Sequence, residues 1–172
     1  MSSHFSPASL KFLRGLARHN DKAWFEAHRQ DYEAHVRQPF LRLITDLQPA
    51  LAAVSPHFRA DPRTVGGSLF RIHRDARFSS DKSPYKPWQG ARLFHERRRF
   101  ALDDTEVLSR APRGFPADFE FIDDLKHRNW VFWRPLDDAT MTGPRLRRTL
   151  EADLVALGPL IDYLCAALDL EF

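Results

Sequence analysis

Two long runs of apolar residues with helical spacing, one near each end of the chain, restrict what this sequence can fold into more than any other feature. From Trp24 onward, apolar side chains recur every three or four residues as far as Leu51. The C-terminal run has a stripe of its own, made of Leu146, Leu150, Leu154, Leu157, Ile161, Leu164 and Leu168. This spacing predicts amphipathic helices, each of which must bury one face against another element.

Start and stop signals divide the two runs into separate helices. Ser6-Pro7 predicts the start of a first helix, and His19-Asn20-Asp21 is expected to end it and to cap the next. Within the long N-terminal run, Pro39 and Pro49 interrupt the helical pattern, and a kink or a break is predicted near residues 37–39. In the C-terminal run, Gly158-Pro159 predicts a break in a helix that spans residues 144–170.

The middle of the chain changes from helical spacing to alternation, which is typical of strands. Residues 68–74 alternate between an apolar and a mixed face, and residues 90–95 alternate again. A polar loop joins the two segments, so they are expected to be neighbouring antiparallel strands. Further on, residues 116–127 predict a helix and residues 130–133 a short aromatic strand. Together these elements predict an α+β fold, in which a small antiparallel sheet is flanked by N-terminal and C-terminal helices.

Length and composition agree with one packed domain that spans residues 1–172. A chain of 172 residues and 20.0 kDa with 43% hydrophobic residues can build a single core. One cysteine excludes an internal disulfide framework, and no apolar stretch approaches the ~20 residues of a membrane span. A cytoplasmic protein with no membrane partner is therefore expected.

Basic residues are concentrated in one third of the chain. Residues 63–99 contain ten Lys or Arg side chains and three Asp or Glu side chains, whereas the whole chain has a net charge of only +3. Most of these cations are arginines, whose planar fork of donors suits phosphate and carboxylate groups. This segment therefore predicts an anionic partner.

The strand and loop of residues 70–86 hold most of the candidate binding residues. A rigid strand that runs into a loop can aim several side chains at one ligand. The predicted ligand-binding residues, for a phosphate-bearing or other anionic small molecule, are Arg71, Arg74, Arg77, Lys82, Lys86 and Arg92. The alternative is structural: Arg77 pairs with Asp75 or Asp81, and these ion pairs hold the loop in place.

Several short motifs resemble those of a known family, DUF2461. The similarity covers nearly the whole chain and rests on residues 20–25 (NDKAWF), 37–40 (RQPF), 66–72 (GGSLFRI), 74–79 (RDARFS), 81–86 (DKSPYK) and 112–115 (PRGF). The family is uncharacterised, so the resemblance implies no catalytic residue. Similar members usually have roughly fifty residues between the strand at 91–96 and residues 112–115. That stretch typically includes a Gly-Phe-Tyr strand and a second Trp-x-Pro strand. The resemblance thus implies that this chain lacks a central segment, with its join near residues 97–100.

Other kinds of chemistry find little support in the sequence. His73, Asp75 and His95 offer three potential metal ligands, but no recognised spacing of zinc ligands occurs, and neither a metal nor a cofactor is predicted. Cys165 lies on the apolar stripe and is expected to be buried. Trp88 within the basic segment leaves a different class of function open. In that alternative the protein is a non-catalytic interaction domain whose basic face docks an acidic partner or nucleic acid.

Overall fold

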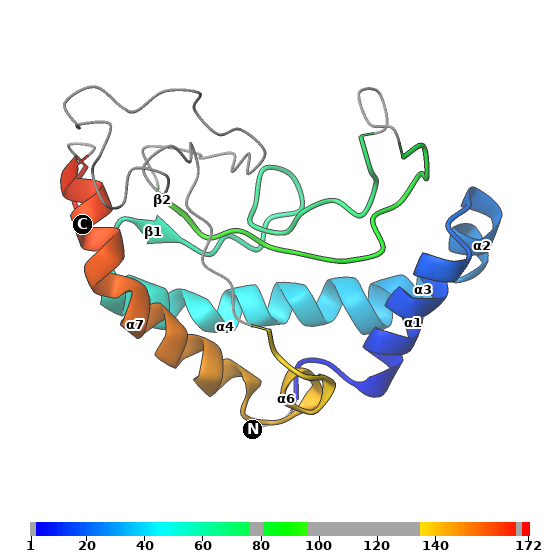
Figure 1. Cartoon of the computed structure of the whole chain (residues 1–172), viewed down its shortest axis with the longest axis horizontal. Coiled ribbons are helices and arrows are strands. Elements are labelled where there is room, and N and C mark those ends of the chain that lie inside the picture. The colour runs from blue at the N-terminus through cyan, green and yellow to red at the C-terminus, as the bar shows by residue number, and fades with distance from the viewer. Residues whose placement is uncertain (1–2, 76–80, 96–134, 168–169) are drawn as a thin grey trace, which may run out of the picture. The chain divides into compact units, whose positions relative to one another are not determined.

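Helices form most of the described structure. The computed structural model describes residues 3–75, 81–95, 135–167 and 170–172 (Figure 1). Met1–Arg98 and Leu136–Phe172 together make up one compact unit. Arg99–Pro135 is a second unit, which falls almost entirely outside the described residues, as do the helix predicted at 116–127 and the strand predicted at 130–133. That the chain is a single domain stays a prediction.

The first two helices begin where the sequence predicts. Helix α1 spans Pro7–Arg18, and the Ser6 backbone N–H before it donates to Ser9 Oγ at 3.1 Å. Helix α2 spans Lys22–Ala27, and Asp21 Oδ1 accepts a hydrogen bond from the Trp24 N–H at 2.9 Å. In each case a side-chain oxygen accepts a hydrogen bond from a backbone N–H that would otherwise have no partner at the start of the helix.

The long N-terminal run continues as three helical segments. A short helix, α3 (Arg29–Tyr32), leads into a π turn, η1 (Glu33–Arg37), and then into α4 (Gln38–Val54). At the π turn, the Gln38 N–H donates to the Glu33 carbonyl, five residues back. Pro39 has no N–H to donate, so the hydrogen-bond pattern must change near it. The kink or break expected near Pro39 therefore takes the form of a π turn.

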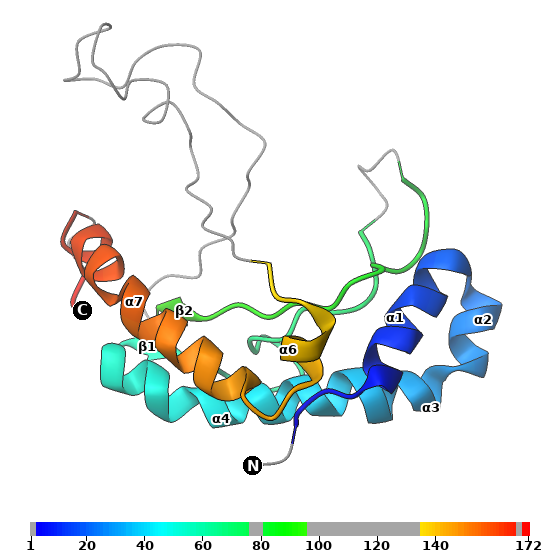
Figure 2. The ribbon, with the colours of Figure 1, turned by 60° about the horizontal axis from the view of Figure 1, so that its bottom comes forward.

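The C-terminal helix is continuous where a break was expected. After the short helix α6 (Asp138–Thr142), helix α7 spans Leu146–Ala167 and continues through Pro159. The predicted break at Gly158-Pro159 is wrong. Helix α7 packs along α4 (Figure 2), and a Cβ on Gly158 would lie 3.4 Å from Val54 Cγ1. This close packing holds the helix together across a residue that removes one of its hydrogen bonds.

The predicted α+β fold is wrong, because the described residues are predominantly helical. Within those residues, regular pairing is confined to β1 (Phe58–Arg59) and β2 (Phe94–His95), which are antiparallel and two residues long. Residues 68–74, predicted as a strand, are extended and run beside α4 in Figure 1, but they form no strand. Their backbone pairs with the second extended segment at two isolated bridges, Leu69 with Ala91 and His73 with Tyr85.

The register between these two bridges explains why no sheet forms there. The bridges are four residues apart on the first segment and six apart on the second. Two additional residues must therefore bulge out on the second segment, and such an insertion disrupts a ladder locally. Pro87 lies within this bulge and cannot donate a ladder hydrogen bond. The Gln89 side-chain amide donates to the Phe70 carbonyl instead.

Three clusters of buried side chains hold the elements of this unit together. The first joins α1, α2, α3 and η1 to the extended segments, and it contains Phe12, Leu16, Phe25, Tyr32, Val36, Ile72 and Tyr85. The second joins the N-terminal segment and α4 to α7 through Phe5, Leu43, Leu47 and Leu146. The third joins α4 to residues 58–60 through Ile44, Leu51 and Ala60. The extended segments are thus fixed on the helices by packing, with little help from strand pairing.

The expected burial of Cys165 is confirmed. His28 is partly buried as well, and its ring stacks on Trp24 with the centroids 4.1 Å apart. None of the helices in the described part of the chain has the length and apolarity that a membrane crossing needs.

We expect Cys165 to react slowly with a thiol reagent in the native protein. Burial, with a contribution from Asp162, raises the pKa of the thiol, and the thiolate is the reactive form. Labelling with a chromogenic disulfide should therefore speed up strongly when urea unfolds the protein. Equal rates with and without urea would contradict the burial of this side chain.

Candidate functional site

One cavity brings together side chains from the helices and from the extended segments. It has a volume of about 550 Å³ and is lined by helices α2 to α4, residues 64–67, residues 69–73 and Arg92. Four arginines line it: Arg29, Arg37, Arg71 and Arg92. The lining also has one carboxylate, Glu33, and an apolar part that includes Phe25 and Phe70. We call it the basic cavity.

The helical wall of the basic cavity carries a row of charges. Arg29, Glu33 and Arg37 follow one another at intervals of four residues, so they share one side of the helical run. Arg37 Nη1 lies 2.9 Å from Glu33 Oε2, and its Nη2 donates to Thr64 Oγ1 at 2.9 Å. Arg37 therefore links the helix to the turn that forms the opposite wall.

That turn depends on two glycines. Gly66 has a φ of 71°, a conformation that side chains disfavour. At Gly67 a Cβ would lie 2.1 Å from the Arg63 carbonyl oxygen, which leaves room only for hydrogen. Ser68 closes the turn: its N–H donates to the Asp61 carbonyl at 2.6 Å, and its Oγ accepts from the Asp61 N–H at 2.8 Å.

Two of the six predicted binding residues, Arg71 and Arg92, line the basic cavity. Arg71 is 69% exposed and lies 3.8 Å from the Asp75 carboxylate, which is a loose ion pair. Arg92 is partly buried, and its guanidinium lies 5.8 Å from the centroid of the Phe94 ring. The buried Nε–H of Arg92 finds no acceptor within the described residues.

The other predicted binding residues lie elsewhere. Arg74 does not line the cavity; its Nη1 pairs with Asp81 at 2.8 Å, and its Nε is also buried without an acceptor in the described part of the chain. Lys82 is exposed, and Lys86 lies over aromatic rings beside the cavity. Arg77 lies outside the described residues. Ion pairing thus accounts for Arg74, whereas the pairing that the structural alternative predicts for Arg77 stays a prediction.

Tyr32 also lines the basic cavity, and its hydroxyl group is held by a hydrogen bond. Burial, together with the neighbouring Glu33 carboxylate, raises the pKa of Tyr32 to about 12. The phenol therefore keeps its proton at neutral pH, and it donates to Gln89 Oε1 at 3.1 Å. Gln89 in turn bonds the Phe70 carbonyl, so these two residues position the ring of Phe70 in the lining.

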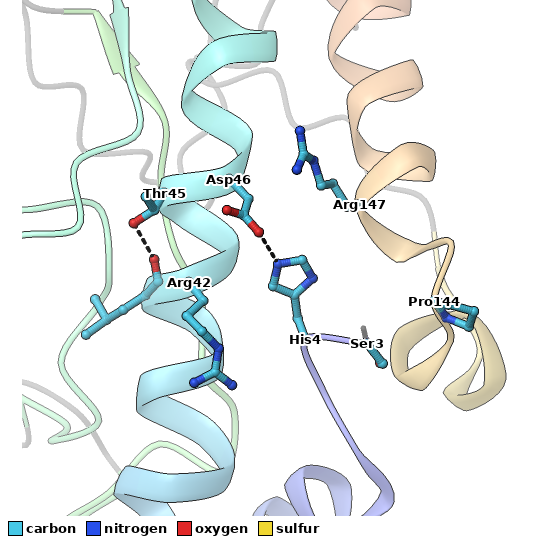
Figure 3. Close-up of a pocket in the computed structure, with 8 residues that line it drawn as sticks. Ser3, His4, Arg42, Thr45, Asp46, Pro144 and Arg147 are labelled. Atoms are coloured by element: carbon cyan, nitrogen blue, oxygen red, sulfur yellow. Dashed lines mark hydrogen bonds and ion pairs between the residues drawn. The ribbon is translucent and has the colours of Figure 1, made fainter. Parts of the chain in front are cut away.

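Two other cavities contain histidines. Figure 3 shows one of about 410 Å³, where the His4 ring faces the Asp46 carboxylate and Arg147 projects from α7. His4 Nε2 lies 2.8 Å from Asp46 Oδ2, a contact that ties the N-terminal segment to α4. A third cavity, of about 530 Å³, lies beside α1 and is lined by His19, His28 and His35. Within the described ranges, no group of three or more His, Cys, Asp or Glu side chains is placed to hold a metal ion.

Comparison with known proteins identifies the family of this chain. The model of the family described as "Conserved hypothetical protein (DUF2461)" matches residues 8–102 and 96–163. The chain belongs to the DUF2461 family. Its two partial matches, which meet near residue 100, are consistent with a DUF2461 member that lacks a central segment. No curated protein and no solved structure matches the chain.

Proposed function

We propose that the basic cavity of this DUF2461 protein binds a small anionic ligand, such as a phosphate ester or a carboxylate. The observation that carries the proposal is the buried Nε–H of Arg92, which has no acceptor in the described part of the chain. A buried donor without an acceptor lowers the stability of a fold. An anionic oxygen in the cavity would accept hydrogen bonds from the guanidinium of Arg92 and would offset its charge.

The charge of the lining supports the same proposal. Four arginines face one carboxylate around this cavity, and Arg37 already pairs with that carboxylate. Arg71 is held only loosely by Asp75, so its donors are available to a ligand. Arginines that surround a concave site favour a small ligand, which can contact several of them at once. An acidic protein or a nucleic acid, the alternative partners, would instead need cations spread over an outer face. A cytoplasmic location stays a prediction.

Thermal unfolding with pyrophosphate tests the proposal. We expect millimolar pyrophosphate to raise the Tm of the wild type, compared with sodium chloride at equal ionic strength, because a ligand that binds only the folded state stabilises it. Arg92→Gln should weaken the apparent affinity roughly ten- to hundredfold, since it removes a charge-assisted contact. Arg148→Gln is the matched control: it removes the same charge from an exposed site on α7 that does not line the cavity.

Two results would contradict the proposal. One is an unchanged Tm of the wild type at saturating pyrophosphate. The other is an equal loss of affinity in Arg92→Gln and Arg148→Gln, which would show a general effect of charge. A response to single-stranded DNA in the absence of any response to pyrophosphate would favour the docking function instead.

A further inference from the structure

Lys86 differs from the other described lysines in its surroundings. Lys11, Lys22 and Lys82 are exposed, whereas Lys86 is partly buried. Its Nζ lies 5.6 Å from the centroid of the Phe70 ring and 5.1 Å from that of the Trp88 ring. Phe70 lines the basic cavity, so the amine lies over a ring that forms part of the cavity wall.

The backbone fixes this position. The Lys86 N–H donates to the Ile72 carbonyl at 2.8 Å, and the Arg74 N–H donates to the Pro84 carbonyl at 2.9 Å. Lys86 is therefore paired with the segment that carries both Arg71 and Arg74. The bulge that follows, around Pro87, directs the chain so that the Trp88 ring meets Phe70 edge-on at 6.4 Å.

The same surroundings favour the neutral amine. Burial lowers the pKa of Lys86, and the positive charges of Arg71 and Arg74 lower it further. The two ring faces attract the ammonium form and oppose this shift. An amine that is desolvated and lies next to other cations is the usual form of a nucleophilic lysine.

We propose that Nζ of Lys86 forms an imine with an aldehyde or ketone whose anionic group binds at Arg71 in the basic cavity. The inference rests on the proposed anion binding and adds the class of ligand, an anionic carbonyl compound. In the reaction, the lone pair of the neutral amine attacks the carbonyl carbon and forms the C–N bond. The carbonyl oxygen then leaves as water with the two hydrogens of the amine, so no oxidant or reductant is needed.

Labelling with pyridoxal 5′-phosphate tests the inference. The full-length protein is incubated with this anionic aldehyde below saturation, cyanoborohydride reduces the imine, and peptide mass spectrometry measures modification at each lysine. We expect Lys86 to be modified ahead of Lys11, Lys22 and Lys82, and pyrophosphate to compete. Arg71→Gln should lower the modification of Lys86 roughly tenfold, because a charge-assisted contact to the phosphate is lost. Pyridoxal, which has no phosphate, should show no such preference.

Matched variants make the outcomes separable. Lys86→Arg keeps the positive charge and should abolish the preferred modification, whereas Lys82→Arg should leave it intact. Equal modification of Lys11, Lys22, Lys82 and Lys86, or equal preference for Lys86 with pyridoxal and with its phosphate, would overturn the inference. If pyrophosphate still raises the Tm in that case, anion binding stands and only imine formation fails. If pyrophosphate has no effect on the Tm or on labelling, both proposals fail.

Discussion

Replacing Leu16 with alanine is expected to lower the free energy of unfolding by ~2–5 kcal/mol, the usual loss for a fully buried leucine. Leu16 is inaccessible to solvent and packs in the cluster that joins α1 to Phe25, Tyr32 and Val36. Aromatic side chains make up much of this cluster and cannot move far into the space that the leucine leaves. Urea denaturation followed by circular dichroism measures the change.

The matched control is the same substitution on α7. Leu164 is 42% exposed, so Leu164→Ala removes few packing contacts and should change the free energy of unfolding by roughly 0.5 kcal/mol or less. Similar losses in the two variants would show that α1 is not packed as described.

The second large effect is expected at Gly67. Its Cβ in a Gly67→Ala variant would lie 2.1 Å from the Arg63 carbonyl oxygen and 2.7 Å from that of Asp61. Both atoms belong to the backbone, so the turn itself must open, at a cost of ~1–3 kcal/mol. Because this turn lines the basic cavity, the rise in Tm with pyrophosphate should shrink as well. Urea denaturation and thermal unfolding with pyrophosphate measure the two effects.

Gly158→Ala provides a comparison of opposite sign. In α7 the added Cβ would make an ordinary contact with Val54, and alanine in place of a helical glycine stabilises by about 0.5–1 kcal/mol. If both glycine variants were equally destabilised, the difference between the crowded turn and the helix would be refuted.

Local signals in the sequence predicted the helices well and the pairing of strands poorly. Asp21 and Ser6-Pro7 define helix starts through contacts with residues nearby, so the sequence alone is sufficient there. Alternation around Phe70 correctly indicates an extended backbone, but a ladder also needs a constant register with a partner. The register here changes by two residues at Pro87, and the alternation of either segment contains no trace of that change.

The sequence predicted the cations on only one wall of the basic cavity. The density of cations in residues 63–99 indicates Arg71 and Arg92, which line the basic cavity. Arg29 and Arg37 were missed, although they follow His28 and Val36 of the apolar stripe by one residue each. Charged residues in that position usually form the solvated edge of a helix. Only the turn at residues 64–67, which packs over this edge, makes them part of a cavity.

The π turn at Glu33–Arg37 also determines which buried cluster each half of the long helical run packs into. A π turn holds one residue more than an α-helix of the same length, and each residue turns a helix by about 100°. With one residue fewer, Leu43 and Leu47 would be rotated away from the N-terminal segment and α7, while Tyr32 and Val36 stayed in place. The number of residues in the π turn therefore sets the rotation of α4 relative to the helical segment before it. Deleting a single residue from the π turn would therefore change which elements each half packs against, even if every remaining side chain were kept.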